Sequence, residues 1–170
     1  MPGTVIGTSL KNGFPGSFAR MGDQVIRTRP VAGGSGDIPF GHAVILTSTG
    51  EATKADATAT AATFAGVAVR RVKQPGSYKE EAVAAYKAYD AADIIERGSV
   101  NVVCNVGSPA PGGAVYLRTK ANESITGGVV GGFEASSDTT NSVQLTNCAW
   151  GTGKDADGVA ELVILTRQGV

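Results

Sequence analysis

Apolar residues recur at every second position in three separate runs of this chain. The clearest run, residues 100–106, alternates Val, Val, Cys and Val with Asn, Val and Asn. Shorter runs of the same kind occupy residues 67–70 and 115–118. Because successive side chains of a strand point to opposite faces, each run predicts a β-strand with one buried face. Gly98 and the PAPGG cluster at residues 109–113 are typical of turns between such strands.

Further strands are expected at residues 24–28, 40–47, 93–97, 143–150 and 159–166. Residues 40–47 are predicted to be buried on both faces, and residues 159–166, apolar in both alternating sets, to lie inside a sheet. The 24 glycines, the 7 prolines and an aromatic content of only 6% suit short strands joined by tight turns. We therefore predict a mainly all-β fold of about nine strands, either a compact β-barrel or a β-sandwich.

Two segments depart from the strand pattern. Residues 51–63 (EATKADATATAAT) are small and polar and are expected to form a surface loop. Residues 78–93 contain the run KEEAVAAYKAYDAAD, which consists of strong helix formers with apolar residues at helical spacing. This run predicts one short helical insertion in the β-rich fold.

The first 36 residues are divided by turn-forming clusters at residues 13–16 and 31–39. Most of this segment is expected to lie extended, because only residues 24–28 look strand-like. We predict an extended N-terminal arm over residues 1–36 and a single β-rich domain over residues 37–170. Phe14 and Phe18 are apolar anchors with which the arm could grip a neighbouring subunit. A frayed terminus is an equally weighted alternative.

The charge balance bears on possible partners. Fifteen Lys and Arg residues match fifteen Asp and Glu residues, so the net charge is zero. Proteins that bind nucleic acid or anionic membranes usually carry an excess or a cluster of basic residues, so we expect neither partner. The sequence shows no secretion signal and no apolar run of membrane-spanning length, and we expect synthesis in the cytoplasm.

Residue types that carry chemistry are sparse. His42 is the only histidine and lies in an apolar run, so it is expected to be packed rather than to act as a ligand or base. Cys104 and Cys148 are widely spaced and are predicted to be buried free thiols rather than a disulfide or a zinc site. The Gly-rich turn at residues 151–158 lacks the spacing of a phosphate-binding loop and the ligands of a calcium loop. We expect no catalytic, cofactor or metal site.

A few residues suggest contacts with a protein partner. Arg70 and Arg71, with Lys73, form the densest basic spot; they are interpreted either as solvated charge at a strand end or as guanidinium groups that pair with carboxylates on a partner. Trp150, the lone tryptophan, ends a predicted strand and is interpreted either as a core residue or as an interface anchor. The candidate partner contacts are Phe14, Phe18, Arg27, Arg29, Arg70, Arg71 and Trp150.

Four segments taken in order resemble the head decoration, or structural cement, proteins of tailed bacteriophages: FAGVAVRRVKQ, IIERGSVNVVC, PGGAVYLRT and NCAWGTGKDADGVAELVIL. The segment GDIPFGHAVI is also similar, so the resemblance covers most of the chain from Asp37 onward. Each motif is short, and their order makes the resemblance specific. The chain departs from the family pattern at residues 78–93, where a helix-forming segment replaces a turn-rich one.

The resemblance implies a compact β-rich protein without an active site. It also implies binding to the major capsid protein on the outside of the expanded head, where the protein would bridge subunits and stabilise the shell. Family members oligomerise, often as trimers, so a homotrimer on the virion surface is expected, made in the cytoplasm of the bacterial host.

Two other classes of function remain open at this stage. One is a small trimeric β-fold nucleotide hydrolase, although its acidic, metal-linked motif is not found in the sequence. Magnesium-dependent turnover of a nucleotide would support it. The other is a carbohydrate-binding module of a virion, for which Trp150 and four tyrosines are the available aromatic residues. A glycan array would test it.

Overall fold

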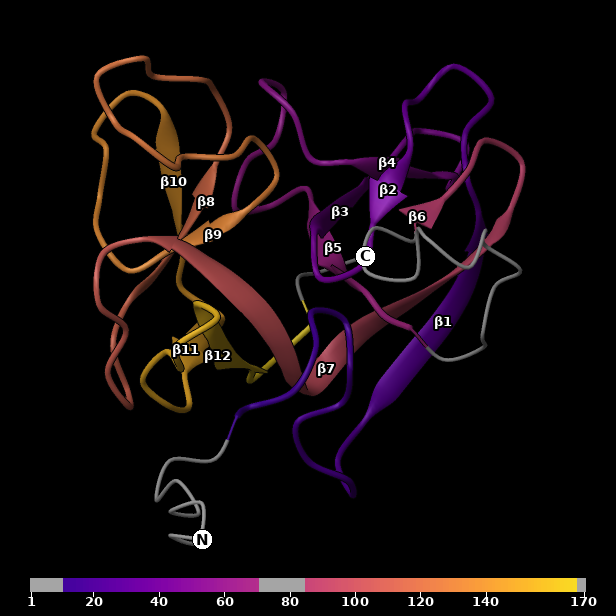
Figure 1. Cartoon of the computed structure of the whole chain (residues 1–170). Coiled ribbons are helices and arrows are strands. Elements are labelled where there is room, and N and C mark those ends of the chain that lie inside the picture. Colours follow the sequence, from indigo (N-terminus) through magenta and orange to yellow (C-terminus); the bar gives the residue numbers. More distant parts are fainter. Residues whose placement is uncertain (1–10, 71–84, 168–170) are drawn as a thin grey trace, which may run out of the picture.

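The computed structural model describes residues 11–70 and 85–167, and every regular element within these ranges is a β-strand (Figure 1). The prediction of a mainly all-β fold is confirmed. In chain order the strands are β1 (Val25–Pro30), β2 (Ile38–Pro39), β3 (Ala43–Leu46), β4 (Ala52–Lys54), β5 (Phe64–Ala68), β6 (Ala85–Tyr86), β7 (Ala91–Val106), β8 (Val115–Arg118), β9 (Phe133–Glu134), β10 (Ser142–Leu145), β11 (Cys148–Trp150) and β12 (Val159–Ile164).

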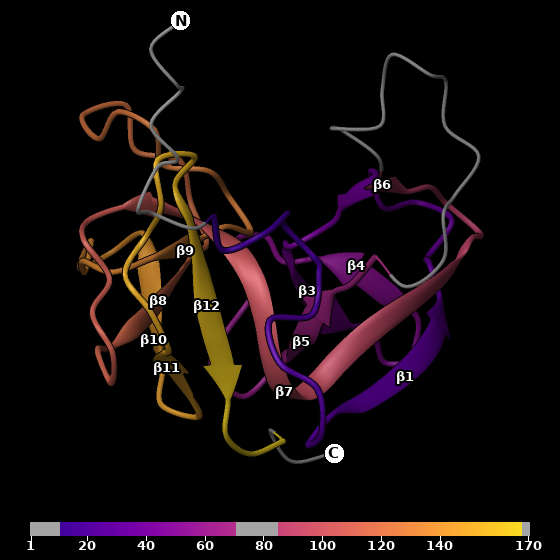
Figure 2. The same ribbon diagram turned by 60° about the horizontal axis from the view of Figure 1, so that its bottom comes forward.

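Strand β7 is the spine of the molecule. It is 16 residues long and bends midway, so that its two halves serve different sets of strands (Figures 1 and 2). The first half pairs with β1 and with β5, both antiparallel. The second half pairs antiparallel with β12 and, near its end, parallel with β9. Strands that are distant in sequence are therefore joined through this one element.

Gly98 lies inside β7, at the junction of the two halves, and not in a turn as the sequence predicted. Its φ of 115° is one that side-chain-bearing residues rarely adopt. A Cβ atom here would lie 2.7 Å from the carbonyl oxygen of Asp23. Glycine thus permits a bend and a close backbone approach within a continuous strand, and the two strands predicted at residues 93–97 and 100–106 are one.

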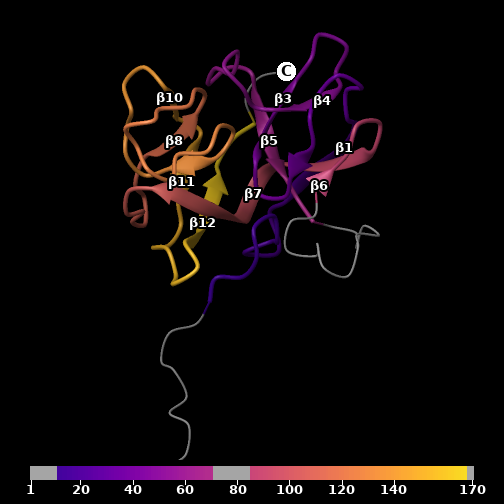
Figure 3. The same ribbon diagram turned by 45° about the horizontal axis from the view of Figure 1, so that its top comes forward.

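The strands form one ten-stranded sheet with branches. Its main path is β10-β8-β9-β7-β5-β3-β4, while β1 and the β12–β11 pair join it at β7. Figure 3 shows the two resulting groups, β8 to β12 on one side and β1 and β3 to β5 on the other, with β7 between them. Within the described residues the path does not return to its start, so the barrel alternative is wrong in the sense of a closed barrel. Strands β2 and β6 form a separate small sheet.

Alternation along the strands fills two apolar cores. In β3, Ala43 and Ile45 belong to the larger core, and Val44 between them belongs to the smaller one. In β5, Val67 and Ala68 divide in the same way. The prediction that the strand within residues 40–47 is buried on both faces is thereby confirmed. Strand β12 is paired on both edges, with β11 and β7, which confirms its predicted place inside the sheet.

The predicted helical insertion is wrong where the structure can be compared with it. Residues 78–84 lie outside the described ranges, while Ala85–Tyr86 is strand β6 and Ala91 begins β7. Tyr86 is 2% exposed; its ring packs edge-to-face on Phe40 with centroids 5.0 Å apart. Its hydroxyl donates a hydrogen bond of 2.6 Å to the carbonyl of Val69. These tertiary contacts outweigh the helix propensity of the segment.

Three smaller differences concern strand boundaries. Strand β4 lies within the surface loop expected at residues 51–63. The small side chains of Ala52 and Ala55 are fully buried, so this part of the segment packs into the fold. The single strand expected at residues 143–150 is split into β10 and β11. Strand β9, only two residues long, was not predicted and pairs with both β7 and β8.

Two parts of the N-terminal segment, residues 16–19 and β1, lie along the spine. Gly16 and Ala19 donate backbone hydrogen bonds to Asn101 and Ser99 of β7, and Asn101 donates one to Ser17. Farther along the chain, all six residues of β1 pair with β7. The second half of β7 is thus bordered by residues 16–19, and its first half by β1. The division into an arm and a domain stays a prediction.

Candidate interaction surface

The two phenylalanines predicted as anchors have different surroundings. Phe14 is 76% exposed, and only its carbonyl is engaged, by the amide and hydroxyl of Ser17. Phe18 forms an isolated bridge with Val100 and packs against the larger core. Phe14 is therefore available to a partner, whereas Phe18 holds its own segment onto β7.

Arg27 and Arg29 occupy alternate positions of β1, which places them on the same face of that strand. The Arg27 Nε lies 3.4 Å from Oε2 of the buried Glu96. The same oxygen receives Arg167, from Nη2 at 2.6 Å and Nε at 2.8 Å. Glu96 therefore forms ion pairs with two arginines, one near each end of the described chain.

Arg29 has different surroundings. Its Nε is buried and has no hydrogen-bond partner, and within residues 11–70 and 85–167 its guanidinium group makes no ion pair. The group faces a cavity of about 320 Å³, here called the Arg29 pocket. Its principal lining residues are Arg29, Leu46, Ser48, Phe64, Glu96 and Arg167.

The remaining predicted contacts are spread over the molecule. The Arg70 guanidinium lies 5.9 Å from the centre of the Phe40 ring, a distance at which a cation is attracted to an aromatic face. Arg71 lies outside the described residues. Trp150 is 1% exposed and belongs to the larger core, which is the core alternative of its two interpretations, so its indole presents no surface to a partner. Among the described candidates, Arg27 and Arg29 share one face of β1. The backbone amide of Arg70 donates a hydrogen bond of 2.9 Å to the carbonyl of Gly16, which places Arg70 beside the segment that carries Phe14 and Phe18.

Exposed apolar side chains that were not singled out from the sequence also mark the surface. Met21 is 84% exposed and Leu165 is 52% exposed, and both line a hollow of about 350 Å³ beside the bend of β7. Tyr89, 83% exposed, has a φ of 69° in the turn that precedes β7. The signal for Met21 is an apolar residue within the polar turn Arg-Met-Gly-Asp, whereas Leu165 has no comparable signal because it ends an apolar strand.

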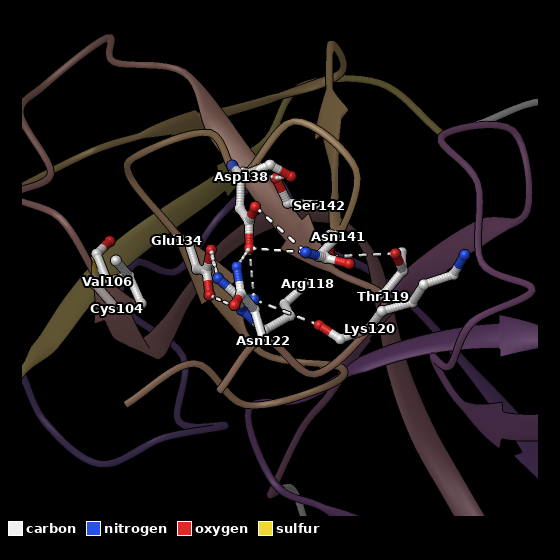
Figure 4. A network of polar contacts seen from close by, with 10 residues as sticks. All are labelled: Cys104, Val106, Arg118, Thr119, Lys120, Asn122, Glu134, Asp138, Asn141 and Ser142. Atoms are coloured by element: carbon white, nitrogen blue, oxygen red, sulfur yellow. Dashed lines mark hydrogen bonds and ion pairs between the residues drawn. The ribbon is translucent and has the colours of Figure 1, made fainter. Parts of the chain in front are cut away.

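A buried network centred on Arg118 of β8 links this strand to β9 and to the loop that follows β9 (Figure 4). Arg118 and Glu134 are both fully buried and make a two-point ion pair, through Nε and through Nη2 at 3.0 Å. The Arg118 Nη1 donates to Asp138 at 3.0 Å and to the carbonyl of Lys120 at 3.3 Å. The side-chain amides of Asn122 and Asn141 also donate hydrogen bonds to the Asp138 carboxylate. Sequence reasoning missed this network, because its members are 16 and 20 residues apart and form no local motif.

The network has a structural character. A paired guanidinium and carboxylate with this fork geometry is among the stronger charge-assisted contacts. The hydrogen bond to Glu134 raises the pKa of Arg118, and the amide of Asn122 lowers the pKa of the Asp138 carboxyl, with Asn141 and Arg118 adding to that effect. A Cβ on Gly128 would lie 2.5 Å from the Arg118 Nε, so a loop backbone covers the pair closely. All charges of the network are satisfied internally.

Of the residues considered for chemistry, Cys104 and Cys148 are buried and His42 is partly buried. Burial lowers the pKa of His42 and raises the pKa of Cys148 to about 12. Cys104 and Cys148 are buried free thiols, as predicted. In the part of the chain that the structure describes, no three His, Cys, Asp or Glu side chains are grouped so as to hold a metal ion. The same part contains no helix that is long and apolar enough to span a bilayer.

Comparison with known proteins gives a family match and matches to solved structures. Residues 1–165 match the family described as structural cement protein (E217 gp24/Pam3 gp6). A chain in a solved structure of the capsid of Myoviridae phage XM1 superposes with a TM-score of 0.71 at 18% identity, over 98% of each chain. At this level of identity the superposition shows a shared fold. No curated protein matches the sequence.

Proposed function

Because the chain belongs to the phage structural cement protein family, we propose that it binds the outer surface of an expanded phage head, bridges neighbouring major capsid protein subunits and stabilises the shell. The observation that carries this proposal is the family match over nearly the whole chain. The fold shared with a chain of a phage capsid supports it. The chain is a phage structural protein, and the two alternatives left open by the sequence, a nucleotide hydrolase and a carbohydrate-binding module, have no counterpart in these matches.

The surface proposed for the contact has an apolar and a basic part. Phe14 and Met21 flank residues 16–19, which border β7, and Met21 and Leu165 line the same hollow. Arg27 and Arg29 form the basic part on β1. Apolar side chains exposed to this degree favour burial against a partner, and basic groups at the margin favour correct orientation.

Many modest contacts are sufficient for such a role. A shell presents the same site repeatedly, so small interfaces add up when one molecule bridges several subunits. We propose that the chain binds as a homo-oligomer, with a trimer as the state implied by the family resemblance. Light scattering of the free chain and of chain released from heads would measure that state.

The experiment that tests the function is a titration of purified chain onto heads that lack it. Saturable binding and a rise in the temperature at which heads break open are expected. A chain that does not bind at any accessible concentration would contradict the proposal. Removing residues 1–36 is a poor test, because this deletion also removes β1 and the contacts of residues 16–19 with β7.

Point variants resolve the surface better. Replacing both Met21 and Leu165 with Ser is expected to weaken binding without unfolding the chain, since both side chains are exposed. The matched control is Val129→Ser, which removes an apolar side chain that is 42% exposed in a different part of the surface. Equal binding by the double variant and the control would remove this hollow from the proposed surface.

A further inference from the structure

We infer that the Arg29 pocket receives one acidic side chain, Asp or Glu, from a neighbouring capsid protein subunit when the chain is bound to a head. This inference rests on the proposed function and adds the chemistry of the contact. It begins from the charges around Glu96. Arg27 and Arg167 both direct their nitrogen atoms at Oε2 of Glu96, so this carboxylate is already shared.

Arg29 is the third guanidinium group of this region and the one without an acceptor among the described residues. Its Nε is buried and makes no hydrogen bond. A buried donor left without a partner costs about 1–3 kcal/mol, and buried polar groups in native proteins are nearly always paired. An acceptor supplied by another molecule would explain why an arginine is placed here.

The pocket is suited to a carboxylate on a short aliphatic stem. Leu46 and Phe64 supply apolar walls, and Ser48 and Thr63 supply hydroxyl groups. Apolar walls lower the local dielectric constant and strengthen an ion pair that forms within them. They also favour a side chain, whose methylene groups cover apolar surface, over a small hydrated anion that would leave the walls uncovered.

The balance of charges around the pocket also favours binding of a carboxylate. Arg27 and Arg167 both pair with the one carboxylate of Glu96, and Arg29 lines the same pocket as Glu96 and Arg167. One further carboxylate would give Arg29 a partner and leave the existing pairs of Glu96 intact. Planar guanidinium groups pair with carboxylates through two parallel hydrogen bonds, which fixes the orientation of the partner as well as its charge.

The first test compares two variants that each remove one positive charge. Arg29→Gln is expected to weaken binding to heads by about tenfold or more, as loss of a desolvated charged contact does. Lys87→Gln, an exposed residue that does not line the pocket, is expected to change binding by less than about twofold. Thermal unfolding of the free variants should match that of the unchanged chain.

The outcomes separate this inference from the proposed function. Equal binding by Arg29→Gln and Lys87→Gln would overturn the role of the pocket and leave head binding standing. Failure of the unchanged chain to bind would overturn the proposed function itself. Binding of inorganic phosphate to the free chain, lost in Arg29→Gln while head binding persists, would assign the pocket to a small anion instead.

A second test identifies the partner directly. Arg29→Lys introduces an amine, and a carbodiimide joins an amine to a carboxylate only when the two are in contact. After treatment of decorated heads, a cross-link between position 29 and an acidic residue of a capsid peptide is the expected product. A cross-link to a second copy of this chain, or only to Glu96 of the same molecule, would overturn the inference.

Discussion

The two arginine clusters of this protein lie in different parts of the sheet and are completed in different ways. Arg118 is fully buried, and Glu134 and Asp138 come from the same chain to meet it. Arg29 is partly buried, and within the described residues no carboxylate meets it. A charge that the chain itself neutralises stabilises the fold, whereas one left without a partner is available to another molecule. The predictions below test this distinction.

The largest effect is expected at Arg118. Arg118→Ala removes one partner of a buried pair and leaves Glu134 charged in an apolar environment, which should cost about 3–5 kcal/mol of unfolding free energy. Chemical denaturation measures it. The control is Arg97→Ala, which breaks an exposed pair with Asp23 at 2.8 Å and should cost less than about 1 kcal/mol. Similar losses in the two variants would show that burial does not distinguish these pairs.

An intermediate effect is expected at Glu96, which is buried although its partners are partly exposed. Glu96→Gln keeps the shape of the side chain but removes the ion pair with Arg27 and weakens the hydrogen bonds from Arg167, so a loss of about 1–3 kcal/mol is expected. Both arginines keep access to water, with side chains 43% and 40% exposed. A loss as large as that of Arg118→Ala would place Glu96 in the same class as the buried network.

A smaller effect, confined to acid, is expected at Asp138. Hydrogen bonds from Asn122, Asn141 and Arg118 hold the pKa of this carboxyl below its ordinary value of 3.8. The folded-state pKa is depressed, so the stabilisation is fully present above pH 3.8 and is lost as the pH falls through the folded-state pKa.

Denaturation of the unchanged chain and of Asp138→Asn between about pH 5 and pH 2 measures this contribution. The variant should be less stable at neutral pH and should lose stability less steeply in acid. Asp56 and Asp155 also have lowered pKa values and contribute to the slope of both proteins, so the difference between the two curves is the result to compare. Parallel curves would show that the Asp138 carboxyl does not contribute to the loss of stability in acid.

The smallest effect on stability is expected at Arg29. Arg29→Met removes a guanidinium group that has no partner in the described chain, and the unfolding free energy should change by less than about 0.5 kcal/mol or rise slightly. A loss above about 2 kcal/mol would show that Arg29 supports the fold, and the contrast with Arg118 would no longer hold.

The sequence predicted the parts of the fold that depend on local alternation. Strand β5, the second half of β7 and β8 overlap the period-two apolar runs, and β3 and β12 lie where both alternating sets are apolar. The pattern could not reveal β4 or β9, which are short and exist because neighbouring strands offer them hydrogen-bond partners. Nor could it show that Tyr86 would lie in a strand and pack on Phe40, against the helix propensity of its neighbours.

The candidate surface was predictable only in part. Arg27 and Arg29 occupy alternate positions of a strand and so share one face, a relation that the strand period supplies. The pairing of Arg167 with Glu96, 71 residues away, depends on the packing of the chain ends and has no sequence signal. The same reason hides the Arg118 network and the hollow that Met21 lines together with residues 163–165.

The most direct test of the cement role is quantitative mass spectrometry of purified phage particles. We predict that this chain is present in a fixed proportion to the major capsid protein, and that both are retained together through gradient purification. Its absence from particles, or an amount that varies between preparations, would contradict the central claim.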